Sequence, residues 1–391
     1  MTRRRAALLL GCALTGTAQE VPRPTGTPYK GGRGAPAGFE GPGRELPEPT
    51  GLREILIGYY GPEGDSHADG AILWQGAALA LDELNREGGY EGKPFRLVSR
   101  WSENPWRGGA AAVTRMAFED RVWAIVGSVD GAGTHLAEQV VVKALLALVN
   151  PVATDRSIHM AGVPWMFSVV QGDDQHTRLL AAALEGRGVV LFSATDHDSR
   201  AFTAMLRTAF GQSRTEIRLL IEFEPDRPEL TEPVRSMIAA KPETVVVIAG
   251  ARPSARCVLA LREAGYAGTV AGGPWFGRAV FAEGAGSAAE GALFPSVGEI
   301  SSDFERKFSA AFQHRPDYAA AGAYDAVRIV AAAIRTAGAN RARIRDAIEK
   351  IGIWHGAGGD IEWDEYGQNQ RSPVLVRIAA GRAVLGKGAT R

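Results

Sequence analysis

From residue 54 onward, short apolar runs alternate with helix-length amphipathic stretches. The runs are rich in β-branched and aromatic residues, which favour strands, and the stretches between them repeat apolar residues at helical spacing. This alternation predicts a parallel sheet with helices on both faces, an α/β fold. The predicted strands are EILIGYY (54–60), FRLVSRW (95–101), VWAIVGS (122–128), LLALVNP (145–151), WMFSVV (165–170), GVVLFSA (188–194), RLLIEF (218–223), TVVVIAG (244–250) and GTVAGG (268–273).

The stretch from residue 70 to 87 illustrates the helical pattern. Leu73, Ala77, Ala80 and Leu84 recur at intervals of four, three and four residues, which places them on one face of a helix. The sequence NREGG at 85–89 then ends the pattern with glycines, as a helix C-cap does. We therefore predict a surface helix with one buried stripe.

The strand–helix alternation occurs twice, from about residue 53 to 172 and from about 173 to 297. After residue 298 the pattern is mainly helical, and the segment GDIEWDEYGQNQRSPVLVRIA (359–379) resembles a hairpin. We predict two α/β lobes, because a single core rarely grows beyond roughly 250 residues. The first would comprise residues 53–172 plus 298–354, and the second residues 173–297 plus 355–391.

The N-terminus combines a basic start, a short apolar stretch and small residues, an order that predicts an export signal over residues 1–18. LLGC at 9–12 is similar to a bacterial lipobox, so lipid attachment through Cys12 is the alternative. Residues 19–52 are dense in Pro and Gly and predict a flexible leader. We expect a periplasmic or other extracytoplasmic protein, either free or anchored through Cys12.

Composition and the absence of certain motifs exclude several classes of partner and function. Lys plus Arg and Asp plus Glu number 44 each, so net charge gives no reason to expect nucleic acid as a partner. After signal cleavage Cys257 is the one cysteine left, and a single thiol forms no internal disulfide. No hydrolase, metalloprotease or nucleotide-binding motif has its proper flanks. We therefore predict a protein that is not an enzyme and has no cofactor.

The stretch IVGSVDGAGTHL (125–136) places a glycine-rich turn between a predicted strand and a helix expected over 134–144. Amide hydrogens at a helix start are unpaired and carry partial positive charge, so the turn is suited to a carboxylate or another oxyanion. Gly131 would allow close approach, and the hydroxyl groups of Ser128 and Thr154 could donate to the same oxygen. Asp130 would either cap the helix or accept a hydrogen bond from the ligand.

Two aromatic residues, Trp101 and Trp275, follow predicted strands and are candidates for an aromatic wall around the ligand, with Glu103 beside the first. The sequence DHD at 196–198 contains groups that can bind metals, but it does not supply the three or four convergent ligands of a closed site. We therefore predict no metal site.

Several segments together resemble the type I periplasmic solute-binding proteins, specifically the branched-chain amino acid and amide group. They are GPEGDSHADGAILWQGAALALDELNREGGYEGKPFRLV, AIVGSVDGAGT, LALVNPVATDRSI, AGGPWFG, AAEGALFPS, AAAGAYDAVRIVAAAI and GDIEWDEYGQ, which span the chain after residue 53. The resemblance implies two Rossmann-like lobes that are joined by three crossovers and close on a ligand for delivery to an ABC permease.

The resemblance also implies particular ligand contacts. Residues 128–133, including Ser128, Asp130 and Gly131, match the turn that meets the ligand carboxylate, and Ala153 and Thr154 match the next binding loop. In the second lobe the chain departs from the family pattern. Ser199 stands where the family often has an aromatic residue, and Trp275 stands where the amino-acid binders have the acid that accepts the amino group.

These observations predict an exported, monomeric substrate-binding protein of an ABC importer, with a small carboxylate- or amide-bearing solute as its ligand. A ligand sensor of the same fold, read by a membrane receptor, is one alternative. An enzyme that uses the cleft, with Glu103, Asp130 or His197 as its base, is another.

Overall fold

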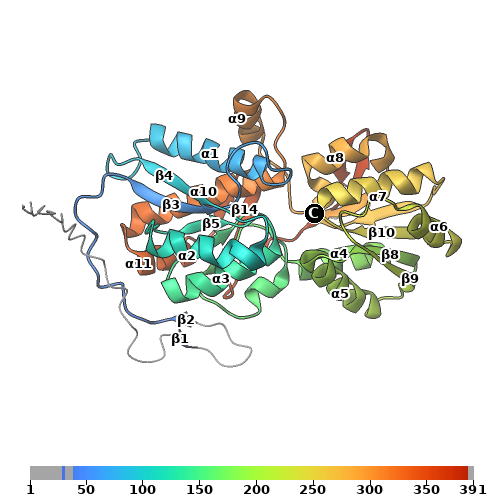
Figure 1. Ribbon diagram of the computed structural model, residues 1–391, viewed down its shortest axis with the longest axis horizontal. Helices are drawn as coiled ribbons and strands as arrows, with labels where there is room; N and C mark the ends of the chain where they lie inside the picture. The colour runs from blue at the N-terminus through green and yellow to red at the C-terminus, as the bar shows by residue number, and fades with distance from the viewer. Residues whose placement is uncertain (1–28, 31–37, 386–391) are drawn as a thin grey trace, which may run out of the picture.

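The computed structural model describes residues 29–30 and 38–385. The predicted signal at residues 1–18, Cys12 and much of the leader lie outside the described residues. Two α/β lobes lie side by side (Figure 1), as the sequence predicts. Within the described ranges, no helix combines the length and hydropathy that crossing a bilayer requires.

The first lobe contains a five-stranded sheet in the order β4-β3-β5-β6-β7, and every pair in it is parallel. Its strands are β3 (Ile55–Tyr60), β4 (Phe95–Arg100), β5 (Ile125–Gly127), β6 (Leu148–Asn150) and β7 (Met166–Ser168). Its helices are α1 (Ala71–Arg86), α2 (Ala110–Phe118), α3 (Gly131–Ala144), α9 (Ser302–Phe312), α10 (Tyr318–Ala337) and α11 (Arg341–Glu349). Helices α1 and α10 cover one face of the sheet, and α2 and α3 cover the other.

The second lobe contains a seven-stranded sheet in the order β16-β15-β12-β11-β10-β8-β9, in which only β15 and β16 run antiparallel to their neighbours. Its strands are β8 (Gly188–Ala194), β9 (Glu216–Phe223), β10 (Thr244–Ile248), β11 (Thr269–Gly272), β12 (Leu293–Ser296), β15 (Val374–Ala379) and β16 (Arg382–Leu385). Its helices are α4 (Asp173–Ala183), α5 (His197–Gly211), α6 (Thr231–Ala239), α7 (Ala251–Glu263) and α8 (Ala279–Ala285).

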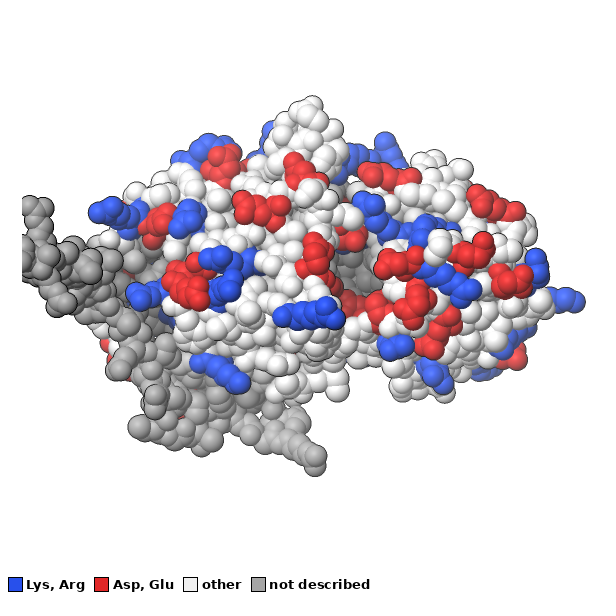
Figure 2. Space-filling view, in the orientation of Figure 1, with Lys and Arg blue, Asp and Glu red and all other residues white. Residues whose placement is uncertain are grey.

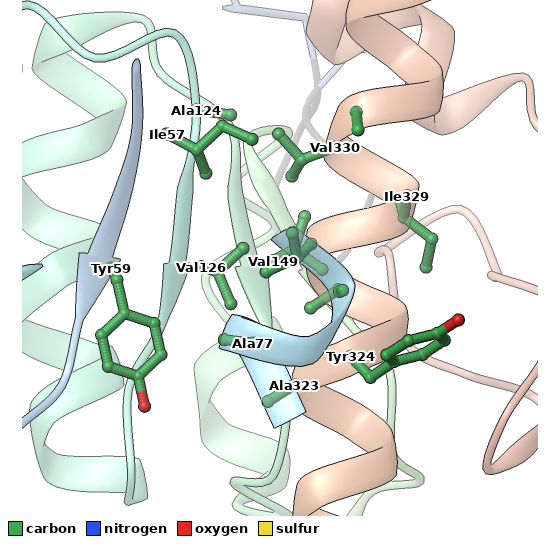
Figure 3. Packing of buried hydrophobic residues seen from close by; sticks show 14 of the residues in the cluster. Ile57, Tyr59, Ala77, Ala124, Val126, Val149, Ala323, Tyr324, Ile329 and Val330 are labelled. Carbon is green, nitrogen blue, oxygen red and sulfur yellow. The ribbon is translucent and has the colours of Figure 1, made fainter. Parts of the chain in front are cut away.

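The predicted apolar stripe of α1 is confirmed: all four of its residues are buried. It packs against α10, whose alanine-rich first turns let the two helices approach closely. A Cβ atom at Gly76 would lie 2.1 Å from the carbonyl oxygen of Ala320, so only glycine fits there. Figure 3 shows the side chains of β3, β5 and β6, among them Ile57 and Val126, facing these helices.

Three crossings join the lobes: β7 to α4, β12 to α9, and the segment that leads into β15. Side chains tie these crossings to one another. The Gln171 amide donates to the Val297 carbonyl at 3.1 Å, and the Asn369 amide donates to the Val169 carbonyl at 2.6 Å. These bonds hold the crossings side by side at one edge of each lobe.

The C-terminal segment differs from the prediction of one hairpin in the second lobe. β14 (Gly359–Ile361) pairs with β13 (Trp354–Gly356), and Ile361 is buried in the first lobe's core. The Trp363 indole donates to the Ser168 carbonyl at 2.8 Å, which also fixes this segment on the first lobe. Residues 354–363 thus pack on the first lobe, because Ile361 is buried in the same core as α10.

The later part of the predicted leader is also ordered on the first lobe. β1 (Tyr29–Lys30) pairs with β2 (Gly38–Phe39), and the Phe39 ring packs edge-on against Trp165 at 4.6 Å. Arg44 forms a bidentate ion pair with Asp346, and the Asn340 amide donates to the Gly43 carbonyl at 2.7 Å. The prediction of a flexible leader is therefore wrong for residues 38–52, since these long-range contacts offset the low apolar content of the segment.

Candidate functional site

The glycine-rich turn leads from β5 directly into α3. The helix begins at Gly131, three residues before the predicted start, so Gly131 and Gly133 lie in its first turn. Asp130 is the N-cap: its Oδ1 accepts a hydrogen bond from the Gly133 amide at 2.7 Å. The capping role that the sequence allowed for Asp130 is confirmed.

The hydroxyl groups of the turn are used within it. Ser128 is buried, and its Oγ donates to the Asp130 carbonyl at 2.8 Å. The Thr134 hydroxyl donates to the same carbonyl at 2.7 Å. Ser128 therefore shapes the start of α3 in this arrangement of the lobes.

A carboxylate of the second lobe binds the start of α3. The Gly131 amide donates to Oδ2 of Asp198, in the first turn of α5, at 2.8 Å. A Cβ atom at residue 131 would lie 2.6 Å from the other oxygen of Asp198. Gly131 thus permits the close approach that the sequence predicts, and the oxyanion that approaches here belongs to the protein.

Acidic groups crowd this junction, and Figure 2 shows red side chains on both sides of it. Burial and the nearby Asp130 carboxylate together raise the pKa of Asp198 to about 8. Burial and the charge of Asp196 likewise raise the pKa of Asp130, against the hydrogen bond from Gly133. Two carboxylates in one confined site favour sharing a proton, so the junction is poorly suited to a further unpaired negative charge.

The second predicted binding loop follows β6. Asn150 holds it, because its side-chain amide donates to the Ala153 carbonyl at 2.7 Å and its Oδ1 accepts from the Ala153 amide at 2.9 Å. The Thr154 carbonyl accepts from the Asp173 amide at the start of α4, at 2.7 Å. The loop therefore links the first lobe to the first helix of the second, and the role of Asn150 was missed in the sequence.

The two tryptophans lie in different lobes. Trp101 packs beside Tyr60 with ring centroids 5.3 Å apart, and Trp275 packs edge-on against Phe202 at 4.8 Å. Both indole N–H groups are buried without a hydrogen-bond partner. Trp275 also contributes to the core of the second lobe, so its replacement would change stability as well as any ligand contact.

The remaining predicted residues have local partners. The Glu103 side chain is 79% exposed and lies 3.5 Å from Nε2 of His67. Ser199 donates through its amide and its hydroxyl group to Asp196, the N-cap of α5, at 3.0 and 2.7 Å. Ser199 is thus part of the cap that fixes the start of α5, next to Asp198.

A cluster of two histidines and one aspartate, which the sequence did not predict, lies between the two lobes. His135 of α3, Asp155 in the loop after β6 and His197 at the start of α5 bring their side chains together. Nε2 of His197 lies 2.9 Å from Oδ2 of Asp155, and Nε2 of His135 lies 3.4 Å from the same atom. These residues are far apart in the sequence, so no spacing rule could find them.

A buried ion pair forms a second connection between the lobes. Arg278 precedes α8 in the second lobe. Its Nε donates to Oδ2 of Asp317 at 2.9 Å, and its Nη2 donates to the Asp69 carbonyl at 2.8 Å. Asp317 is also the N-cap of α10 in the first lobe. The arginine side chain is 8% exposed and the aspartate 3%, so water screens the pair little.

The buried His159 side chain makes the stability of the protein depend on pH. Its ring bridges the Ser168 hydroxyl and the Tyr366 carbonyl at 2.7 and 2.8 Å, and burial lowers its pKa to about 4. Because the unfolded chain binds this proton at about pH 6.5, the stabilisation is complete above that pH and is lost as the pH falls toward 4. The loss amounts to about 2–3 kcal/mol by pH 4.5.

We expect His159→Gln to remove the pH-dependent stabilisation that His159 contributes. Chemical denaturation of both proteins at pH 7 and pH 4.5 measures it, and the drop in unfolding free energy should be about 2–3 kcal/mol larger for the wild type than for the variant. The comparison of drops cancels any constant cost of the substitution. Equal drops would mean that His159 titrates normally in the folded protein.

Comparisons with known proteins identify the family to which this architecture corresponds. A family model described as periplasmic binding protein matches residues 55–383. A Pseudomonas aeruginosa amino acid binding protein is 28% identical over 125 residues, which are 32% of this chain and 33% of that protein. The match therefore spans a third of that relative's length.

Solved structures share the fold. LivJ from Streptococcus pneumoniae, a branched-chain amino acid transporter substrate binding protein in complex with isoleucine, has a TM-score of 0.77 and 23% identity, over 84% of this chain and 97% of that one. An ABC transporter solute binding protein from R. palustris in complex with benzoate has a TM-score of 0.74 and 16% identity, over 85% and 95% of the two chains. At these identities the likeness shows the fold alone.

Proposed function

Because the chain belongs to the periplasmic binding protein family, we propose that it is the substrate-binding protein of an ABC importer. It binds a small solute between its lobes and presents the closed form to a membrane permease. Family membership implies an extracytoplasmic location, which suits this role. The solute carries a carboxylate or amide oxygen.

The observation that carries this proposal is the Gly131 amide. It lies in the first turn of α3, faces the second lobe and holds a carboxylate oxygen at 2.8 Å. An N–H group at a helix start favours an oxygen with negative charge. When the lobes separate, Asp198 leaves with the second lobe and the amide becomes available to an oxygen of a solute.

The proposed solute oxygen takes the place of Asp198 Oδ2. A carboxylate or an amide carbonyl satisfies the same donor, and displacing Asp198 also separates its carboxyl group from Asp130. A neutral amide oxygen would relieve the crowding beside Asp130, whereas a carboxylate solute leaves the number of acidic groups there unchanged. The solved structures of the same fold hold isoleucine in one case and benzoate in another, so the fold does not decide whether the solute has an amino group.

Binding is coupled to lobe closure and needs no covalent chemistry. The three crossings lie together at one edge, which is the arrangement of a hinge. The contact of Arg278 with Asp317 forms only when the lobes are together. A solute that adds contacts to both lobes shifts the population toward the closed form.

Native mass spectrometry of protein purified without denaturation, followed by a thermal-shift panel of small carboxylates and amides, tests the proposal. We expect at least one member to raise the melting temperature, because a ligand at 100 times its Kd stabilises the folded state by about 2.7 kcal/mol. Gly131→Ala should remove the shift, since the added Cβ would lie 2.6 Å from Oδ1 of Asp198, whose carboxyl group the solute is proposed to replace.

Gly211→Ala is the matched control, because a Cβ at residue 211 meets no atom within 4 Å. It should keep the wild-type shift. A folded protein that no carboxylate or amide stabilises would contradict the proposed solute class. A full shift in Gly131→Ala would exclude the start of α3 as the binding group.

A further inference from the structure

The cluster of His135, Asp155 and His197 lies between the lobes. We propose that it is a binding site for a divalent transition metal of the Zn²⁺ class, formed by both lobes. Its three candidate ligand atoms, two imidazole nitrogens and one carboxylate oxygen, all lie within 4.8 Å of one another. The proposal concerns the metal alone and holds whatever the solute is.

The donor set matches zinc chemistry. Zinc binds imidazole nitrogen and carboxylate oxygen at about 2.0–2.2 Å, so neighbouring ligand atoms of a tetrahedral site lie about 3.3 Å apart. Oδ2 of Asp155 lies 2.9 Å from Nε2 of His197 and 3.4 Å from Nε2 of His135. Small side-chain movements would suffice to reach these ligand distances.

Neighbouring groups orient the ligands as they do around bound metals. Oδ1 of Asp155 accepts from the amide and the hydroxyl group of Ser157 at 2.9 and 2.7 Å, which leaves Oδ2 to face the two rings. Nδ1 of His135 lies 3.4 Å from the buried Glu138 carboxylate. A carboxylate at Nδ1 favours the tautomer with a free lone pair on Nε2, which is the metal-binding form. The Ser157 hydroxyl donates to Asp155, so Nε2 of His135 donates to Ser157 at 2.7 Å, and metal binding would release this Nε2 proton.

An unpartnered carboxylate oxygen is a separate observation at the same place. Oδ1 of Asp198 is buried and has no hydrogen-bond partner. A Cβ at Gly131 would lie 2.6 Å from this atom and 3.1 Å from Oδ2 of Asp155, so the two oxygens lie close together beside Gly131. A divalent cation there would offset the surplus of buried negative charge, and three protein ligands leave a fourth position for water or for this carboxylate.

The metal would also stabilise the closed form. His135 and Asp155 belong to the first lobe and His197 to the second, so the three atoms converge only while the lobes are together. A ligand that binds one of two conformations shifts the population toward it. Zinc should therefore make the protein more compact in small-angle X-ray scattering.

Calorimetric titration with Zn²⁺ tests the site, on tag-free protein that has been treated with EDTA and dialysed. We expect one Zn²⁺ per chain, and we expect His135→Gln and His197→Gln each to weaken binding at least tenfold. The matched control is His314→Gln, an exposed histidine outside the cluster, which should bind zinc as the wild type does. Cobalt(II) should give a visible absorption band that both cluster variants lose.

Three outcomes would overturn the proposal. The first is no zinc binding by the wild type, which would leave the cluster as a set of hydrogen bonds and ion pairs. The second is wild-type affinity in both cluster variants. The third is loss of binding in His135→Gln with full binding in His197→Gln, which would confine the metal to the first lobe.

Discussion

Asp198→Ala is expected to strengthen binding of a carboxylate-bearing solute about tenfold or more. The Asp198 carboxyl group occupies the Gly131 amide at 2.8 Å, and the proposed solute must displace it. Above pH 8 the Asp198 carboxyl group is ionised. A hydrogen bond to a charged group contributes about 1.5–3 kcal/mol, and at pH 9 removing the competitor returns a similar amount to the solute. Isothermal titration of wild type and variant with the carboxylate found in the thermal-shift panel measures the change.

Two further variants separate the causes. Asp198→Asn keeps an oxygen for the Gly131 amide but carries no charge, so it should give a smaller gain than alanine. Asp226→Ala removes an exposed aspartate of the same lobe and should leave affinity unchanged. Weaker binding by Asp198→Ala would mean that Asp198 accepts a hydrogen bond from the solute, and the model of competition for Gly131 would then be wrong.

Arg278→Met should lower the unfolding free energy by about 3 kcal/mol and shift the protein toward an open form. Breaking a buried ion pair leaves the other charge without its partner, which typically costs 3–5 kcal/mol. Asp317 keeps its capping bonds to the Ala319 and Ala320 amides, at 2.9 and 3.3 Å, so we expect the lower end of that range. Denaturant unfolding gives the stability, and small-angle scattering gives the radius of gyration.

Arg306→Met is the control for loss of an arginine in an ion pair. Arg306 pairs with Asp303 one turn away on α9, where the side chains are 71% and 60% exposed. Exposed pairs of this kind contribute at most about 1 kcal/mol. An equal effect of both substitutions, or an unchanged radius of gyration in Arg278→Met, would contradict the role of Arg278 in joining the lobes.

The local pattern of apolar and polar residues was sufficient to predict most of the fold. Each predicted strand corresponds to an observed one, from β3 to β11, because buried parallel strands require continuous apolar runs. The stripe on α1 was predictable because helical spacing puts its residues on one face. The leader and the C-terminal hairpin were not, since Phe39 packs against Trp165 and Trp363 donates to Ser168, each more than a hundred positions away.

The candidate site divides in the same way. The sequence identified the turn before α3, the capping role of Asp130 and the glycine that permits close approach, because strand, turn and helix are consecutive there. The use of Ser199 in a cap and of Trp275 in the second lobe's core depends on packing, which no local pattern reports.

The order of strands and helices, the presence of two lobes and the turn that leads into α3 could be read from the sequence, although α3 begins three residues earlier than predicted. These features follow from periodicity and turn chemistry, which act over a few residues. The contacts of Asp198 with Gly131, of Arg278 with Asp317, and among His135, Asp155 and His197 became visible only in the folded protein. Each of these contacts joins residues of different elements, and their approach is set by how whole lobes pack and close.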